Sequence, residues 1–223
     1  MSASKDELTF RGAIKEAIDE ELAADENVIF FGEDVAEAGG VFAATPGLRD
    51  KYGDDRVFDT PISELALSSA AFGSAVAGMR PIVEIMFADF LFLAMDSLVN
   101  QSAKYWYLSN EQKSIPLVVR SAVGGGGGFG PIHSQVPISW FLGVPGLKIV
   151  APSTPNDAKR LLKAAIRDEN PVLFFEHKTL YSTAENREEI TGVEVLGKGR
   201  ILREGSDVTL VSCMRGVADC LGA

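Results

Sequence analysis

Short apolar runs alternate with longer amphipathic stretches along most of the chain. Six runs are rich in Val, Ile, Leu and Phe, at residues 27–35, 56–58, 80–87, 115–123, 146–153 and 171–177. Short apolar runs bounded by turn residues are typical of buried strands. Helical spacing of apolar residues occurs at 10–26, 63–79, 88–109 and 154–170. The alternation predicts an α/β fold, with a mostly parallel sheet covered by helices on both faces.

The pattern changes after Lys178. Residues 179–206 are polar, with short extended pieces, and are typical of a connector. Residues 207–213, DVTLVSC, predict a further buried strand, and residues 214–223 predict the start of a helix. A lone strand and a partial helix cannot bury their apolar faces. We therefore expect a first domain at 1–178, a connector at 179–206, and the start of a truncated C-terminal α/β domain at 207–223.

Composition narrows the class of protein. The net charge of -10 among 223 residues argues against a nucleic-acid partner, because phosphate binding needs clustered Lys and Arg. Cys213 and Cys220 lack metal-ligand spacing and are expected to be reduced thiols. The first ten residues do not resemble a secretory signal, and the longest apolar run is too short to span a membrane. We expect a cytoplasmic protein without a membrane partner.

Ligands of parallel α/β sheets bind at the carboxyl ends of the strands, so candidate functional residues should follow strands. The sequence GGGGGFGPIHSQ, residues 124–135, follows one of the predicted strands. Its glycines are consistent with a slack loop or with backbone that passes close to a ligand. His133 is accordingly either a structural hydrogen-bonding residue or a proton carrier, a role that imidazole side chains commonly take.

Two acidic groups follow other predicted strands. Glu64 stands in the first turn of a predicted helix, where the helix dipole alone would favour a carboxylate, although a neighbouring cleft would explain it equally well. Glu33, Asp34 and Glu37 form a cluster that is ordinarily a solvated loop. The residues alone therefore predict an α/β protein with a site built from three loop regions, without naming a reaction.

An ordered set of motifs is more specific than any of them alone. It comprises GEDV, GGVF, DTPISE, FADF, HSQ, PGLKIVAPSTP and FFEHK, spread over almost the whole chain. With these motifs the chain resembles the beta subunit of the thiamine-diphosphate-dependent decarboxylase component of 2-oxoacid dehydrogenase complexes. Pyruvate, branched-chain 2-oxoacid and acetoin dehydrogenases are members of that family. The resemblance implies a transketolase-like pyrimidine-binding domain.

The resemblance also implies roles for individual residues. Glu64 would hydrogen-bond the aminopyrimidine ring of the cofactor, Phe90 would stack on that ring, and Ile62 and Met86 would line the same pocket. His133 would assist acyl transfer to a lipoyl group. Acidic positions that line a proton tunnel between paired active sites correspond to Glu33 and Asp96. A potassium-binding loop region corresponds to Leu117, Ala165, Asp168 and Asn170.

The superfamily's diphosphate and magnesium motif, GDG with a downstream Asn, does not occur in this sequence. In two-subunit members that motif belongs to the alpha subunit, so the resemblance implies magnesium and diphosphate held mainly by that partner. It further implies a heterotetramer, a 2-oxoacid substrate and a lipoyl acyltransferase component as partner. The alternatives are an acetoin dehydrogenase beta subunit and a non-catalytic fragment that acts only as an assembly module. A transketolase-like or deoxyxylulose-phosphate-synthase-like single chain should carry its own GDG region.

Overall fold

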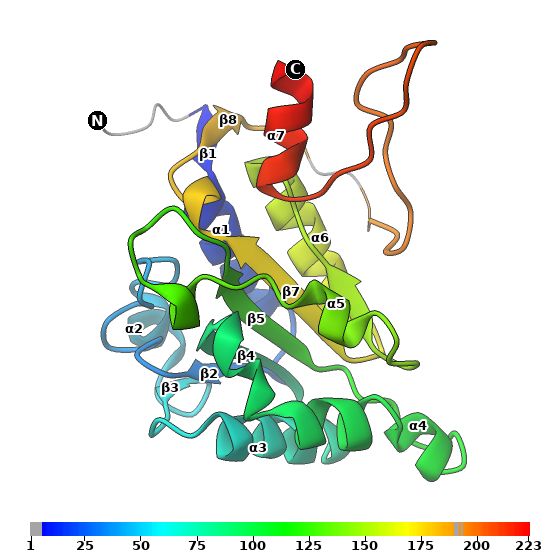
Figure 1. The fold of residues 1–223 in the computed structure, drawn as a ribbon. Coiled ribbons are helices and arrows are strands. Elements are labelled where there is room, and N and C mark those ends of the chain that lie inside the picture. Colours follow the sequence, from blue (N-terminus) through cyan, green and yellow to red (C-terminus); the bar gives the residue numbers. More distant parts are fainter. Residues whose placement is uncertain (1–5, 190–191, 193) are drawn as a thin grey trace.

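The computed structural model describes residues 6–189, 192 and 194–223. Its centre is a six-stranded parallel sheet in the order β3-β2-β4-β5-β7-β6 (Figure 1). Every strand of this sheet coincides with a predicted apolar run, which confirms the α/β fold with a parallel sheet. The strands are β2 (Val28–Gly32), β3 (Val57–Asp59), β4 (Arg80–Phe87), β5 (Val118–Val123), β6 (Lys148–Val150) and β7 (Val172–His177). A separate antiparallel pair joins β1 (Glu7–Thr9) to β8 (Ala184–Asn186).

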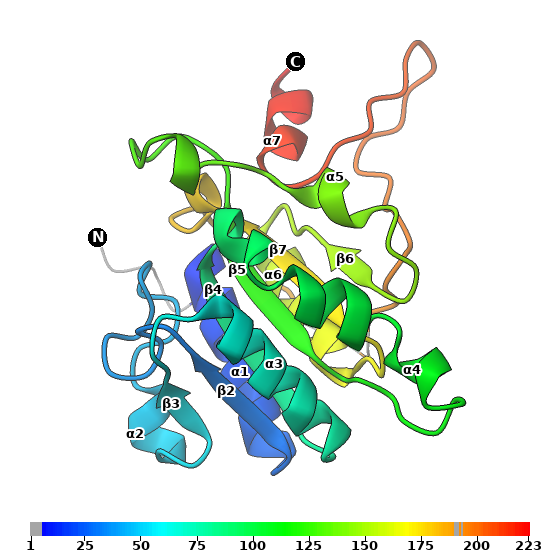
Figure 2. The same ribbon diagram turned by 60° about the horizontal axis from the view of Figure 1, so that its bottom comes forward.

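Helices cover both faces of the sheet (Figures 1 and 2). α1 (Phe10–Ala24) and α6 (Pro155–Arg167) pack against each other on one face, and α3 (Glu64–Val76) packs with η2 (Asp96–Ser102) on the other. Shorter helical pieces are α2 (Leu48–Tyr52), η1 (Ala88–Phe92), α4 (Tyr105–Leu108), η3 (Pro131–His133), α5 (Ile138–Phe141), η4 (Lys178–Leu180) and α7 (Arg215–Gly222). Among the described residues, none of the helices has the length and apolarity needed to cross a bilayer.

Side-chain caps and ion pairs fix the α1–α6 layer. The Thr9 hydroxyl accepts the Gly12 N–H at the start of α1, and the Thr154 hydroxyl accepts the Asp157 N–H at the start of α6. Across the two helices, Lys159 lies 2.8 Å from a Glu16 carboxylate oxygen. Capping each helix satisfies an N–H that has no partner within the helix. The caps therefore fix the residue at which each helix begins, and the ion pair holds the two helices in register.

The continuous helix expected at 88–109 is wrong. The segment is helical in three short pieces of different type: the 3-10 helix η1, the π-helix η2 and the α-helical turn α4. In η2 the Ala103 N–H donates to the Leu98 carbonyl, five residues back, at 3.0 Å. The spacing of apolar residues does not distinguish the 3-10, α and π patterns of backbone hydrogen bonds. The pattern therefore predicts a helix but not its type.

The strand expected at 207–213 is also absent. That segment has no secondary structure and is exposed, with Val211 91% accessible. A strand needs a neighbouring strand for its backbone hydrogen bonds, and within the described part of the chain this segment has none. The helix expected after it is present as α7, and Met214 at its start is buried. The domain boundaries themselves stay a prediction.

A buried ion cluster lies in the middle of the sheet. The Arg120 guanidinium on β5 donates two hydrogen bonds to the Glu176 carboxylate on β7, at 2.7 and 2.9 Å, and one to Glu84 on β4 at 2.8 Å. The Tyr181 hydroxyl donates to the same Glu176 at 2.9 Å. Burial alone would lower the pKa of Arg120, but the charges of Glu176 and Glu84 outweigh it and raise that pKa. The cluster thus joins the three central strands through charges that are paired inside the protein.

Replacing Arg120 tests how much the sheet depends on this cluster. Arg120→Met keeps much of the volume but leaves two buried carboxylates without their cation, which should cost about 3–5 kcal/mol of unfolding free energy. The matched control is Lys51→Met, which removes an exposed ion pair with Asp19 and should cost less than about 1 kcal/mol. Urea unfolding of both variants measures the difference. Equal stabilities would contradict a central role for Arg120.

Gly146 provides a second test, at the turn that leads into β6. Its φ is +90°, and an added Cβ would lie 1.9 Å from the Ala103 carbonyl oxygen. Gly146→Ala should therefore lower the free energy of unfolding by about 2 kcal/mol or more, through backbone strain and this clash. At nearby Gly143 an added Cβ would meet no described atom within 4 Å, so Gly143→Ala is the control. Similar urea midpoints for the two variants would show that the turn accommodates the added methyl group without loss of stability.

Candidate active site

Polar and aromatic side chains gather at the carboxyl edge of the parallel sheet. Glu33 follows β2, Asp89 follows β4, the glycine run follows β5 and Lys178 follows β7. Because all six strands run in the same direction, these segments meet at one edge although they are far apart in the sequence. The edge is therefore the candidate site that the sequence predicted.

Two buried carboxyl groups lie at this edge and interact electrostatically. Glu64 is the first residue of α3 and is 7% exposed, while Glu33 is 4% exposed. Burial and the charge of Glu64 raise the pKa of Glu33, and the Ser63 backbone N–H only partly offsets them. Among the residues that the structure describes, Glu33 Oε1 has no hydrogen-bond partner. The pair therefore favours a proton on Glu33 and has capacity to bond a polar ligand.

The loop that carries Glu33 is fixed by the end of the neighbouring strand. Asp59, the last residue of β3, accepts the Ala36 N–H at 2.8 Å and the Glu37 N–H at 3.1 Å. The Thr60 N–H donates to the Gly32 carbonyl at 2.8 Å. A carboxylate that accepts two backbone N–H groups holds a loop firmly. The cluster of Glu33, Asp34 and Glu37 is thus an ordered turn with one buried acid rather than a wholly solvated loop.

Aromatic rings form the wall beside His133. The imidazole meets Phe87 at a centroid distance of 4.6 Å and Phe90 at 5.3 Å, both edge to face. Phe87 also lies 5.8 Å from Phe129. Phe90 is the FADF aromatic and remains half-buried. The structure therefore brings Phe90 and His133 into direct contact.

The glycine run passes closely over the end of β7. Gly124 has φ +86°, and a Cβ there would lie 2.2 Å from His177 Nε2. The Gly124 N–H donates to the Gln135 carbonyl at 3.1 Å, which ties the start of the run to HSQ. Burial, followed by the charge of Lys178, lowers the pKa of His177. Close backbone packing, rather than slack alone, requires glycine at 124.

The remaining predicted cofactor and tunnel residues lie on the same segments but less deeply. Ile62 is 79% exposed in the loop before α3, and Met86 is half-buried near the end of β4. Asp96 is exposed and accepts a hydrogen bond from Asn100 at 2.8 Å. Of the two residues predicted to line a tunnel, Glu33 is buried and Asp96 is exposed; the tunnel itself stays a prediction.

The residues predicted to bind potassium lie at the opposite, amino edge of the sheet. The Asp168 N–H donates to the Ala165 carbonyl, Asn170 donates to the Asp168 carboxylate, and Leu117 accepts the Val172 N–H. Lys148 Nζ also lies 2.5 Å from that carboxylate. Burial raises the pKa of Asp168, but the hydrogen bonds from Lys148 and Asn170 outweigh it, so that the pKa is lowered. The four positions are neighbours, and the Asp168 charge is already paired.

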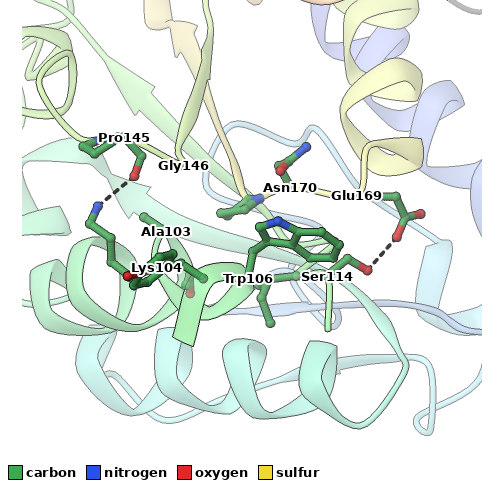
Figure 3. Close-up of a pocket in the computed structure, with 12 residues that line it drawn as sticks. Ala103, Lys104, Trp106, Ser114, Pro145, Gly146, Glu169 and Asn170 are labelled. Carbon is green, nitrogen blue, oxygen red and sulfur yellow. Dashed lines mark hydrogen bonds between the residues drawn. The ribbon is translucent and has the colours of Figure 1, made fainter. Parts of the chain in front are cut away.

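One cavity lies away from the carboxyl edge. It encloses about 540 Å³ beside α4 at the amino edge, between Trp106, Pro145 and Asn170 (Figure 3). A second cavity of about 420 Å³ adjoins the candidate site, between Phe42, Lys178 and Tyr181. We assign the site to the carboxyl edge because the buried acids and His133 are there. Over the described ranges, no group of three or more His, Cys, Asp or Glu side chains is placed to hold a metal ion.

Sequence reasoning gave no role to three residues of this edge. Lys178, Thr60 and Asp89 stand in the motifs FFEHK, DTPISE and FADF, but nothing in those motifs distinguishes them from their neighbours. Lys178 is 8% exposed and Asp89 6% exposed. Lys178 directly follows β7 and Asp89 lies two residues after the end of β4, so the rule that ligands bind at strand carboxyl ends would have found them.

Comparisons with known proteins agree with the fold. Residues 6–183 match the family model "Transketolase, pyrimidine binding domain". The chain is 46% identical over 206 residues to 2-oxoisovalerate dehydrogenase subunit beta of Bacillus subtilis (strain 168), covering 92% of this chain and 63% of that relative. It is 43% identical over 221 residues to pyruvate dehydrogenase E1 component subunit beta, mitochondrial, of Dictyostelium discoideum, covering 97% and 62%.

A solved structure titled "Split gene transketolase, inactive beta4 tetramer" shares the fold, with a TM-score of 0.74 at 20% identity. The match covers 96% of this chain and 65% of that chain. The chain thus spans less than two thirds of the length of these relatives. Since the family model matches most of its residues, the chain belongs to the transketolase pyrimidine-binding domain family.

Proposed function

We propose that this chain is a beta subunit of a 2-oxoacid dehydrogenase that supplies the aminopyrimidine half of a thiamine diphosphate site. The observation that carries the proposal is the buried Glu64 at the carboxyl edge, beside Glu33 and on the same edge as Phe90 and His133. The names of the relatives, beta subunits of 2-oxoisovalerate and pyruvate dehydrogenases, support it.

The residues present fit such a cofactor. Buried Glu33 Oε1 and Thr60 Oγ1 have no hydrogen-bond partner in the part of the chain that the structure describes. Leaving buried polar atoms unbonded is costly, so a ligand that bears N–H groups would stabilise this edge. Glu64 would accept a hydrogen bond from a ring nitrogen of the aminopyrimidine, and the Phe90 ring would stack on it.

When bound, thiamine diphosphate supplies a nucleophilic carbon and an electron sink for decarboxylation. Glu64 would hold the proton at the ring nitrogen, which makes the amino group a better base. The aromatic wall of Phe87, Phe90 and Phe129 would exclude water from the reacting atoms. His133 would carry a proton during acyl transfer to the lipoyl sulfur.

Partners complete this proposal. Because no described cluster suits a divalent metal, the magnesium and diphosphate would be held mainly by an alpha subunit, in a heterotetramer. A lipoyl acyltransferase would take the acyl group. Potassium at Leu117, Ala165, Asp168 and Asn170 stays a prediction, and backbone carbonyls would have to supply its ligands because Lys148 already pairs with Asp168. The cytoplasmic location also stays a prediction.

Glu64→Gln tests the assignment. The amide keeps the shape but cannot share the ring proton in the same way, so the decarboxylation rate of the complex with an alpha subunit should fall about 100-fold or more. Glu37→Gln, an exposed change on the same edge, should keep the rate. The assay uses 2-oxoisovalerate and pyruvate with ferricyanide as electron acceptor. A Glu64→Gln complex with near-normal turnover would remove Glu64 from the mechanism, and failure of the wild-type chain to bind any alpha subunit would favour a non-catalytic fragment.

Glu33→Gln tests the electrostatic repulsion between the carboxyl groups of Glu33 and Glu64. Because its pKa is raised in the folded chain, Glu33 binds a proton more tightly when folded than when unfolded. Its contribution to stability is therefore present below the unfolded pKa and is lost as the pH rises through the folded pKa. Glu33→Gln should raise the free energy of unfolding at neutral pH, with a gain that shrinks on acidification. Urea unfolding across pH 4–8 measures this, and a gain independent of pH would contradict it.

A further inference from the structure

Lys178 is a buried cation next to the candidate site. It is the first residue after β7 and is 8% exposed. Its ammonium group donates a hydrogen bond to the backbone carbonyl of His133. It also lies 5.2 Å from the ring centroid of Phe87 and 4.9 Å from that of Phe129. A lysine that gives up its hydration needs such partners, so its place is set by the loop it binds.

Asp89 holds the other end of the same short segment. It follows β4 and accepts hydrogen bonds from the Gln135 backbone N–H at 3.3 Å and the Gln135 side-chain amide at 2.8 Å. Burial lowers the pKa of Lys178, while the charge of Asp89 partly restores it, which shows that the two groups interact. Residues 133 and 135 are thus held by opposite charges from η4 and η1, the short helices that follow β7 and β4.

The two contacts fix the backbone on either side of Ser134. The His133 side chain has one further constraint, the edge-to-face contacts with Phe87 and Phe90. The preceding glycine run cannot supply stiffness, because glycine leaves the backbone with the widest choice of conformations. The direction of the imidazole therefore depends on the clamp formed by Lys178 and Asp89.

We propose that Lys178 is a positioning residue for His133: together with Asp89 it clamps residues 133–135 so that the imidazole is aimed into the shared active site. The proposal rests on the proposed function, in which His133 serves acyl transfer to the lipoyl group. Group transfer needs a held geometry, and a displacement of about 1 Å can cost about 100-fold in rate. Lys178 would act through the His133 backbone, without touching the substrate.

The first experiment reads the position of His133 without any catalysis. The chain has two histidines, so His177→Gln assigns both sets of imidazole proton resonances in an NMR spectrum. In the wild-type chain the rings of Phe87 and Phe90 should displace the His133 resonances from their free-imidazole positions. Lys178→Met should return them toward those positions while the circular dichroism spectrum stays native.

The matched control is Lys104→Met, because Lys104 Nζ also donates to a backbone carbonyl, that of Pro145, at 2.7 Å and beside the amino-edge cavity. That variant should leave the His133 resonances unchanged. Should Lys178→Met fail to fold, the shorter and more easily hydrated Lys178→Gln carries the same test. Unaltered His133 resonances in a folded Lys178 variant would overturn the clamp.

The second experiment separates the two half-reactions in the complex with an alpha subunit. Lys178→Met should lower acylation of a lipoylated domain about 100-fold, and much more than it lowers ferricyanide-coupled decarboxylation, as His133→Ala should. Lys178→Arg, which can still donate to the carbonyl, should restore most of the lost rate. The double variant with His133→Ala should be no slower than His133→Ala alone, since both changes disable one group.

The outcomes distinguish the two proposals. Equal losses in both half-reactions, or additive losses in the double variant, would overturn the positioning role of Lys178. A wild-type complex that turns over no 2-oxoacid would count against the proposed function, and the NMR result would then decide the clamp alone.

Discussion

The carboxyl edge depends on one buried guanidinium. Arg120 neutralises Glu84 and Glu176 inside the sheet, and Glu176 in turn accepts the hydroxyl of Tyr181. The Tyr181 ring stacks on Phe42 at a centroid distance of 4.9 Å. This contact links the ion cluster of the central strands to the loop that contains GGVF. Charges that could not be buried singly are stable as a group because each has a partner. The positions of the loops around the site therefore depend on the paired charges of Arg120, Glu84 and Glu176, which lie in the strands that carry those loops.

The site itself has the opposite character. Glu33 is buried next to Glu64 and keeps an oxygen without a partner among the described residues, as Asp89 does. Such groups cost stability unless a ligand or a neighbouring chain satisfies them. Arg120, Glu84 and Glu176 are thus paired inside the sheet, whereas Glu33 and Asp89 at its carboxyl edge each keep one oxygen without a partner among the described residues. This division separates the part of the molecule that is fixed from the part that is ready to bind.

The sequence predicted the six sheet strands because parallel strands are apolar on both faces and stand out as short runs. It also predicted Glu64 and His133 as site residues. Glu64 is buried in the first turn of α3, and His133 lies against Phe90; their catalytic roles stay predictions. The sequence-based prediction failed where the pattern of apolar residues does not determine the structure. Helical spacing at 88–109 does not set the hydrogen-bond type, and the apolar run at 207–213 has no strand to pair with among the residues that the structure describes. Lys178 and its carbonyl partner are 45 positions apart in the sequence, a contact that only the topology creates.

The two strands at the borders of the large sheet are both very short. β3 and β6 have three residues each, and each includes a charged residue, Asp59 and Lys148. A short, charged border offers little template for backbone pairing with another molecule. Growth of the sheet by addition of foreign strands, the route that leads to fibrous aggregates, is thereby discouraged. Association with other chains is directed instead to helices and loops, where side chains rather than backbone determine which partner is accepted.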